Sequence, residues 1–158
     1  TRSADVASMT GTNFSSWFNA SQGTFVVSAT PAQRGGTEPS FLSADDGGAG
    51  TSVIRLTMAS NKARAFVVNT TTQLDIFSVA SITPGTFSKM ALAYQASNFG
   101  LSKDGATPVT QSSGSVPSAE TQLQIGKALF TNYLNGWIQS IQYFPVRLPN
   151  STLQALTA

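Results

Sequence analysis

The chain has 158 residues, of which only 10% are charged, and its formal net charge is +2. It contains no cysteine and no histidine, which excludes disulfides, thiolate chemistry, imidazole metal ligands and a Ser-His catalytic pair. The basic residues are scattered rather than clustered as a phosphate backbone requires, so we expect no nucleic-acid partner. No apolar run approaches the roughly 18 residues of a spanning helix, so we expect no membrane insertion.

Short strand patterns separated by turn residues run through most of the chain. Residues 1–20 are predicted to form a leading segment with one short strand, closed by "SSWFN". Strands are then predicted at residues 23–30, 51–59, 63–69, 73–80, 86–96, 98–105, 121–128 and 136–144. Clusters of Gly, Pro, Asn, Asp and Ser lie between them. Many short strands at this spacing indicate a sandwich or a barrel.

The segment at residues 51–59 has the clearest alternation. Ile54, Leu56 and Met58 alternate with a second set that includes Arg55, and this period of two predicts a half-buried strand. Ser60-Asn61-Lys62 is predicted to be a three-residue hairpin link to the next strand.

The only predicted helix lies at residues 150–157. Asn150 or Ser151 is the expected N-cap. Leu148, Leu153 and Leu156 are expected to dock the helix on the sandwich. We therefore expect an all-β fold, an antiparallel jelly-roll sandwich with a short C-terminal helix, as a single domain over residues 1–158.

Four stretches, in chain order, carry a resemblance to a known family. They are "TRSADVASMTGTNFSSWFNASQGTFVVSAT", "FLSADDGGAGTSVIRL" with its Asp-Gly turn, "MALAYQASNFGLSKDG" and the closing "LNGWIQSIQYFPVRLPNSTLQALT". Together they resemble the bacteriophage tail and virion-surface form of the concanavalin A-like, laminin G-like jelly roll over nearly the whole chain. Pro149 departs from the Ser or Thr that is usual before the tail.

The resemblance implies a non-catalytic module on the virion surface, at a tail fibre, a spike tip or the capsid exterior. Such modules frequently bind a host cell-surface glycan or simply decorate the particle. Contacts with other virion proteins and a homo-oligomer, often a trimer, are therefore expected. We expect the chain to be part of a longer or processed virion protein.

Two other functions stay open from the sequence. One is a purely structural role, as a capsid or tail decoration or an oligomerisation domain. The other is a glycan-degrading enzyme, which needs two carboxylates facing each other in a cleft. The acidic residues form no run of the E-x-D-x-x-E type, so the sequence favours a protein without catalysis.

Glycan binding needs an aromatic platform with amide or carboxylate groups around it. The available pieces are Trp17, Phe18, Tyr94, Asn98, Tyr133 and Trp137. We predict the glycan-facing surface at the loop "FTNYLNG", with Tyr133, Asn132, Asn135 and the adjacent Trp137, and Asn98 as a further candidate. The alternative for both tryptophans is that they are partly buried packing residues.

The run "SADDGGAG" suggests one metal site. Asp45 and Asp46 are candidate Ca²⁺ ligands, because calcium takes carboxylate and carbonyl oxygens. The same run is also typical of an ordinary turn, in which Asp bonds to nearby backbone and Gly takes positive φ. No other cofactor is expected.

Overall fold

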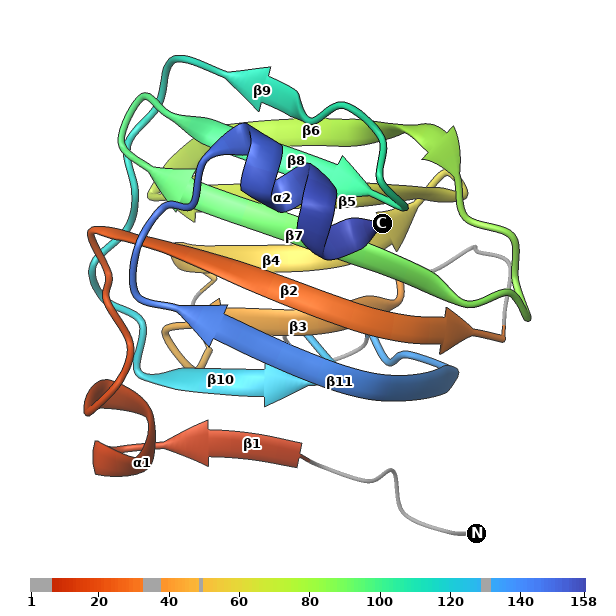
Figure 1. The fold of residues 1–158 in the computed structure, drawn as a ribbon. Coiled ribbons are helices and arrows are strands. Elements are labelled where there is room, and N and C mark those ends of the chain that lie inside the picture. The colour runs from red at the N-terminus through yellow and green to blue at the C-terminus, as the bar shows by residue number, and fades with distance from the viewer. Residues whose placement is uncertain (1–6, 33–37, 49, 129–131) are drawn as a thin grey trace, which may run out of the picture.

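A computed structural model describes residues 7–32, 38–48, 50–128 and 132–158, which form two stacked antiparallel sheets (Figure 1). The six-stranded sheet has the order β1 (Ala7–Thr10), β10 (Gln122–Ile125), β3 (Ser40–Asp45), β4 (Ser52–Ala59), β5 (Lys62–Asn69) and β6 (Thr71–Ser81). The five-stranded sheet has the order β11 (Gly136–Phe144), β2 (Gln22–Pro31), β7 (Ser88–Gln95), β8 (Phe99–Lys103) and β9 (Val109–Gln111). The predicted all-β sandwich is confirmed.

The core lies between the facing sides of the two sheets. On β4, Ile54 and Leu56 are fully buried in it, and on β2 Phe25 and Val27 face them from the other sheet. Successive residues of a strand point to opposite faces, so the alternation of apolar residues decides which side of each strand is inside.

The structure differs from the prediction for β4, because both of its faces are buried. Arg55 is 5% exposed and Thr57 is fully buried, although both lie on the outer face. The segment before β3 runs along this side of β4: the Thr57 hydroxyl and the Met58 amide both donate to the carbonyl of Pro39, at 2.7 and 2.8 Å. A half-buried strand was therefore the wrong prediction.

The link between β4 and β5 is also shorter than predicted. Lys62 belongs to β5, which leaves only Ser60 and Asn61 in the turn, with φ of 51° and 58°. Two consecutive residues at positive φ match the twist of a two-residue hairpin.

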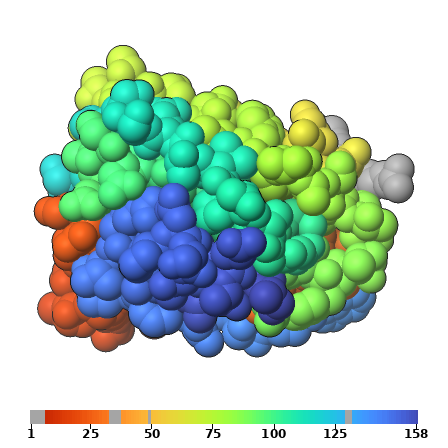
Figure 2. Space-filling view, turned by 45° about the horizontal axis from the view of Figure 1, so that its top comes forward, coloured from red at the N-terminus to blue at the C-terminus, as the bar shows by residue number. Residues whose placement is uncertain are grey.

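The helix α2 (Asn150–Thr157) has the predicted bounds and lies on the outer face of the five-stranded sheet (Figures 1 and 2). Leu153 is buried against Val26 and Ala91, with Leu148 and Leu156 packed beside it, as predicted. The predicted cap is wrong, because Pro149 holds the N-cap position and no side chain caps the helix. The Asn150 side-chain oxygen instead accepts a bond of 2.6 Å from Arg147.

The leading segment contains the predicted short strand, β1, but also an unpredicted turn of helix, α1 (Thr12–Ser15). The first six residues of this segment lie outside the described part of the chain. Within the described residues, no helix is long and apolar enough to cross a membrane.

Candidate functional site

Charged and aromatic side chains gather on the outer face of the six-stranded sheet, on β4, β5 and β6. We call the set the Arg–Phe patch, and its members are Glu38, Arg55, Arg64, Phe66, Asp75 and Phe77. The strand registers place Arg55, Phe66 and Asp75 in one row across the sheet and Thr57, Arg64 and Phe77 in the next. Residues opposite each other in antiparallel strands share a face, which explains why the patch forms.

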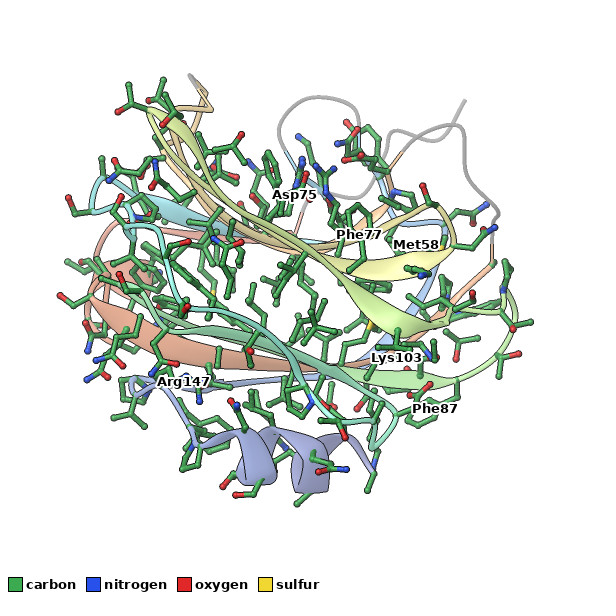
Figure 3. All side chains as sticks on the ribbon, turned by 90° about the horizontal axis from the view of Figure 1, so that it is seen from above. Met58, Asp75, Phe77, Phe87, Lys103 and Arg147 are labelled. Atoms are coloured by element: carbon green, nitrogen blue, oxygen red, sulfur yellow. The ribbon has the colours of Figure 1, made fainter. Side chains whose placement is uncertain are left out.

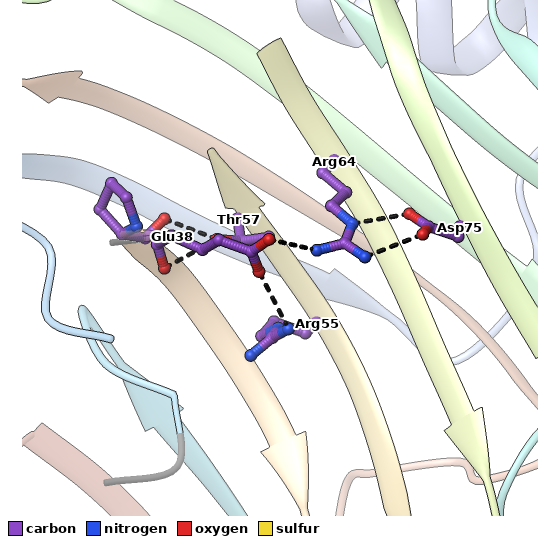
Figure 4. A network of polar contacts seen from close by, with 6 residues as sticks. Glu38, Arg55, Thr57, Arg64 and Asp75 are labelled. Atoms are coloured by element: carbon purple, nitrogen blue, oxygen red, sulfur yellow. Dashed lines mark hydrogen bonds and ion pairs between the residues drawn. The ribbon is translucent and has the colours of Figure 1, made fainter. Parts of the chain in front are cut away.

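Arg64 is the centre of the patch. Its Nε and Nη2 donate to the two oxygens of Asp75 at 2.6 and 2.8 Å, and its Nη1 donates to Glu38 at 2.6 Å (Figure 4). The hydrogen bonds to Asp75 raise the pKa of Arg64 although burial opposes the shift. A guanidinium that holds one carboxylate with two parallel bonds fixes the orientation of both groups.

Arg55 lies deeper and is held less tightly. Its Nη2 is 3.5 Å from Glu38, and its side chain is 6% exposed. Burial lowers the pKa of Arg55, although the nearby Glu38 charge opposes this. In contrast, the Glu38 and Asp75 side chains are each 39% exposed. The patch therefore presents carboxylate oxygens to solvent and keeps its guanidinium groups beneath them.

Phe66 and Phe77 have different roles in the patch. The Arg64 guanidinium carbon lies 4.4 Å from the Phe66 ring centroid, and that of Arg55 lies 5.1 Å from it. Phe66 thus packs with both arginines through cation–π contacts. Phe77 has a single, longer contact, 5.5 Å from Arg64, and lies on β6 at the edge of the sheet. Figure 3 shows Asp75 and Phe77 on the same strand, away from the labelled residues of the other sheet.

Beside the patch, the outer face of the sheet also contains buried polar atoms without a hydrogen-bond partner. Within the described part of the chain, these atoms are Arg55 Nε, Gln124 Oε1 and Ser40 Oγ; a fourth, Glu120 Oε2, precedes β10. Gln124 shares a cross-strand row with Arg55, and Ser40 is paired with Thr57. Buried polar groups in native proteins are nearly always paired with protein or water. Ordered water, which both donates and accepts, is therefore expected beside these atoms.

The predicted loop lies at one end of the sandwich, between β10 and β11. Tyr133 is 42% exposed, with the Lys127 ammonium 5.5 Å from its ring centroid, and Trp137 is 67% exposed. The carbonyl of Asn132 accepts a bond from Ser40, and that of Asn135 accepts one from Ala32, so the backbone of the loop is anchored. Phe130 and Thr131 of this loop lie outside the described residues.

Asn98 lies at the opposite end of the sandwich, so the structure does not bring it to Tyr133 and Trp137. It sits in the turn from β7 to β8, where its carbonyl accepts a bond from Arg147 at 3.4 Å. The β7 end pairs with the start of β2, whereas Trp137 pairs with Thr30 near the end of β2.

The other aromatic candidates are packing residues. Trp17 makes edge contacts with Phe14 and Tyr143, at centroid distances of 5.3 and 4.9 Å, and Phe18 stacks on Phe14 at 4.5 Å. Tyr94 is fully buried. The packing alternative is thus correct for Trp17, while the exposure of Trp137 leaves it available to a ligand.

Both aspartates of the predicted calcium site accept hydrogen bonds from the protein. Asp45 is fully buried and accepts from Ser43, Gln122 and Gln124, and from the amide of Gly47. The amide bonds that Asp45 and Asp46 accept, and the φ of +83° at Gly47, are those of the ordinary turn. Among the described residues, no group of three or more acidic side chains is arranged to hold a metal. Calcium would have to replace these donors, and its binding here stays a prediction.

The structure brings two carboxylates to one face, as a glycanase would require, but not in a usable arrangement. Glu38 and Asp75 both bind Arg64, which lies between them. The scissile bond and the attacking water of a glycosidase need that space. The patch therefore lacks the geometry for hydrolysis.

A cavity of about 390 Å³ opens between the β1 and β11 edges, with Met9, Trp17, Ile125 and Ile141 among its lining residues. Its lining is almost entirely apolar, whereas a saccharide site needs several polar groups. The Arg–Phe patch offers both polar and apolar groups. Its signal in the sequence is the spacing Arg64-x-Phe66 and Asp75-x-Phe77 on adjacent strands, which sequence reasoning missed.

Several solved structures of other proteins are similar to this fold. The CBM40 of the Ruminococcus gnavus IT-sialidase bound to alpha2,3 sialyllactose aligns with a TM-score of 0.75 and 18% identity, over 89% of this chain and 84% of that chain. Domain 4 of AbnA, a GH43 extracellular arabinanase from Geobacillus stearothermophilus, in complex with arabinotriose, gives 0.69 and 16%, over 89% and 68%. Sheep galectin-11 in complex with glycerol gives 0.52 and 12%, over 89% and 96%.

No protein-family model and no curated protein sequence matches the chain. At such low identities the similar structures establish the fold alone, an all-β, jelly-roll-like sandwich of two antiparallel sheets. This confirms the predicted fold class.

Proposed function

We propose that this chain is a non-catalytic glycan-binding module, and that the Arg–Phe patch is its contact surface. Three features support the proposal. Its fold is that of domains whose structures contain sialyllactose or arabinotriose. Its exposed carboxylates and its aromatic edge lie on one face of a rigid sheet. Its two candidate catalytic carboxylates are separated by a guanidinium.

The main support for the proposal is that two hydrogen-bond acceptors, the carboxylates of Glu38 and Asp75, are exposed above a guanidinium group that is held in place. Glu38 and Asp75 are each 39% exposed, while Arg64 is 13% exposed beneath them. Saccharide hydroxyls donate well to charged acceptors, and an acceptor already held in place loses little freedom on binding.

We further propose that the module works on a virion surface, at a tail fibre, a spike tip or the capsid exterior. The support is the resemblance of the opening "TRSADVASMTG" and the closing "YFPVRLPNSTLQALT" to phage virion proteins. In this setting the ligand is a host cell-surface glycan and the neighbours are other virion proteins. Several linked copies, such as a trimer, would convert weak single-site binding into firm attachment.

A glycan array probed with the purified chain tests the proposal. We expect binding to one or more glycans, and Phe77→Ala is expected to reduce it about tenfold, equivalent to roughly 1.4 kcal/mol. Phe87→Ala is the matched control, because Phe87 is 49% exposed and lies apart from the patch (Figure 3). Equal binding by both variants would reject the patch, and loss of binding in Trp137→Ala instead would favour the Tyr133 loop.

One observation favours the structural alternative, an oligomerisation or decoration domain. The edge strand β11 has nine residues, none of them charged, and pairs with β2 on one side only. Native edge strands are usually protected by charges, prolines or partners. If copies assemble through β11, the two functions are distinguished by whether the Arg–Phe patch stays open in the assembly.

A further inference from the structure

We propose that the Arg–Phe patch selects neutral, hydroxyl-rich saccharides over anionic ones. This inference rests on the proposed function and specifies the ligand chemistry of the same site. It follows from the distribution of charge in the patch, from the unused acceptor capacity of its carboxylates and from the apolar surface along β6.

The charges of the patch cancel. Arg64 is paired with both Asp75 and Glu38, and Arg55 lies 3.5 Å from Glu38, so two guanidinium groups face two carboxylates. A ligand carboxylate would have to approach these two acidic groups and displace one of them from Arg64. Displacing Asp75 would break one bidentate carboxylate–guanidinium pair and form a similar pair with the ligand. The exchange therefore yields no net attraction between the patch and an anionic ligand.

The carboxylates retain acceptor capacity after pairing with arginine. An ionised carboxylate has about four lone-pair sites. Each oxygen of Asp75 accepts one bond from Arg64, and Glu38 accepts one close bond at 2.6 Å. The remaining sites lie on side chains that are 39% exposed. They can accept from hydroxyl donors, which a neutral saccharide supplies in pairs.

The edge strand β6 supplies the apolar part of the surface. Asp75 and Phe77 lie on its outer face, and Val79, which follows at the register irregularity between β5 and β6, is 73% exposed. Both rings are half-buried, but Phe66 contacts two guanidinium groups and Phe77 only one, at the longer distance, so Phe77 is the ring more available to the C–H face of a sugar. We infer that the saccharide lies along β6, with hydroxyls at Asp75 and its apolar face on Phe77 and Val79.

Lys62 is the cation that could oppose this selectivity. It lies on the same face of β5, two residues before Arg64, and pairs with Ser81 at the strand end. If an acidic saccharide were the ligand, Lys62 would be a cation on the same face of β5 that takes part in none of the ion pairs of the described residues. Glycan binding by Lys62→Gln therefore distinguishes recognition of neutral saccharides from recognition of acidic ones.

The test is binding of the purified chain to matched glycan pairs, each a neutral oligosaccharide and its sialylated counterpart, at about 20 mM and about 500 mM salt. We expect binding to neutral members that changes less than about twofold with salt and in Lys62→Gln. Asp75→Asn is expected to reduce neutral binding about tenfold and to increase binding to sialylated members, because it releases Arg64 and makes the patch cationic. Thermal unfolding of each variant verifies folding, and Phe77→Ala provides a second variant that leaves the ion pairs intact.

Binding confined to sialylated members, lost at high salt and in Lys62→Gln, would overturn the inference while leaving the module a glycan binder. Binding to no glycan by the folded chain would overturn the proposed function itself, and this inference with it.

Discussion

The Asp46 carboxylate accepts five hydrogen bonds from the loop that joins β3 to β4. The donors are the amides of Gly48, Gly50, Thr51 and Ser52 and the hydroxyl of Thr51. Burial raises the pKa of Asp46, but the hydrogen bonds from Thr51, Gly50 and Gly48 outweigh it and lower the pKa to about 2. A single side chain thus organises a turn of the sandwich.

This depressed pKa predicts a stability loss in acid. Because the folded-state pKa lies below the unfolded value of 3.8, the contribution is present above that value and is lost as pH falls toward 2. We expect an effect on the order of 1 kcal/mol, since solvent screens a partly exposed carboxylate. Urea unfolding of the native chain and of Asp46→Asn, from about pH 5 to about pH 2, measures it. A constant difference between the two proteins over this range would contradict the account.

Gly23 lies against a hydroxyl cluster formed by two tyrosines. The Tyr94 hydroxyl donates to the carbonyl of Asn19 at 2.7 Å and lies 3.0 Å from the Tyr143 hydroxyl. A Cβ on Gly23 would lie 2.5 Å from the Tyr94 oxygen and 2.8 Å from that of Tyr143. The cluster therefore requires glycine at this position.

We predict that Gly23→Ala destabilises the protein by about 1–3 kcal/mol, because the methyl group must displace a buried, bonded pair of rings. Chemical denaturation measures the change. Gly48→Ala is the control, since its Cβ would meet nothing within 4 Å. Similar stability of the two variants would show that the cluster adapts without strain.

At the scale of elements, α2 stabilises the outer face of the five-stranded sheet through one central side chain. Leu153 is fully buried against Val26, Ala91 and Ala93. The Thr157 hydroxyl lies 2.9 Å from that of Ser102, which ties the end of the helix to β8. The helix has only eight residues, so it depends on this packing rather than on its own propensity.

We predict that Leu153→Ala lowers the free energy of unfolding by about 2–5 kcal/mol, as expected for a buried leucine. Ser151→Ala, at an exposed position of the same helix that caps no backbone group, is expected to change it by less than about 0.5 kcal/mol. Thermal unfolding of the two variants compares them. An equal effect would mean that α2 is not docked as described.

Local sequence patterns correctly predicted the strands and the helix whose bounds are set by their own and their flanking residues. The strand at 136–144 and the helix at 150–157 have the predicted bounds, because prolines bound both and leucines mark the docked face. The strand β9 has three residues and α1 has four, too few for a periodic signal. The burial of Arg55 depends on a segment that precedes β3 and reaches it across the sheet, which no local pattern encodes.

The candidate site was harder to predict than the fold, because it also depends on contacts between segments that are distant in the sequence. Arg64 and Asp75 meet only because β5 and β6 pair in one register, and Glu38 reaches Arg64 from the segment that precedes β3. The predicted glycan site consists of aromatic residues near amides, and two of these, Tyr133 and Trp137, are exposed in the structure. Whether they bind a glycan stays a prediction.

At the scale of the whole molecule, the two candidate surfaces face different ways. The Arg–Phe patch lies on the outer face of the six-stranded sheet, and Trp137 lies on the five-stranded sheet, the same sheet that α2 covers (Figures 1 and 3). An assembly through β11 would involve the five-stranded sheet and leave the patch on the opposite sheet available. Adhesion and oligomerisation are thus compatible in one fold.

The proposed assembly through β11 gives a prediction about mass. We expect the chain to have a solution mass of at least twice 16.5 kDa, and Gln142→Lys to shift it toward the monomer, because a charge on an edge strand opposes pairing. Light scattering measures the mass. A monomeric native chain would contradict assembly through β11, and Phe87→Ala controls for unrelated surface effects.

Nuclear magnetic resonance can show whether the outer face of the six-stranded sheet contacts glycan. The backbone and side-chain signals of the isotope-labelled chain would be followed while an array-selected glycan is added. The account predicts that the largest shifts map to Phe66, Asp75, Phe77 and Val79, on β5 and β6. Shifts confined to Tyr133 and Trp137, with those four residues unchanged, would contradict it.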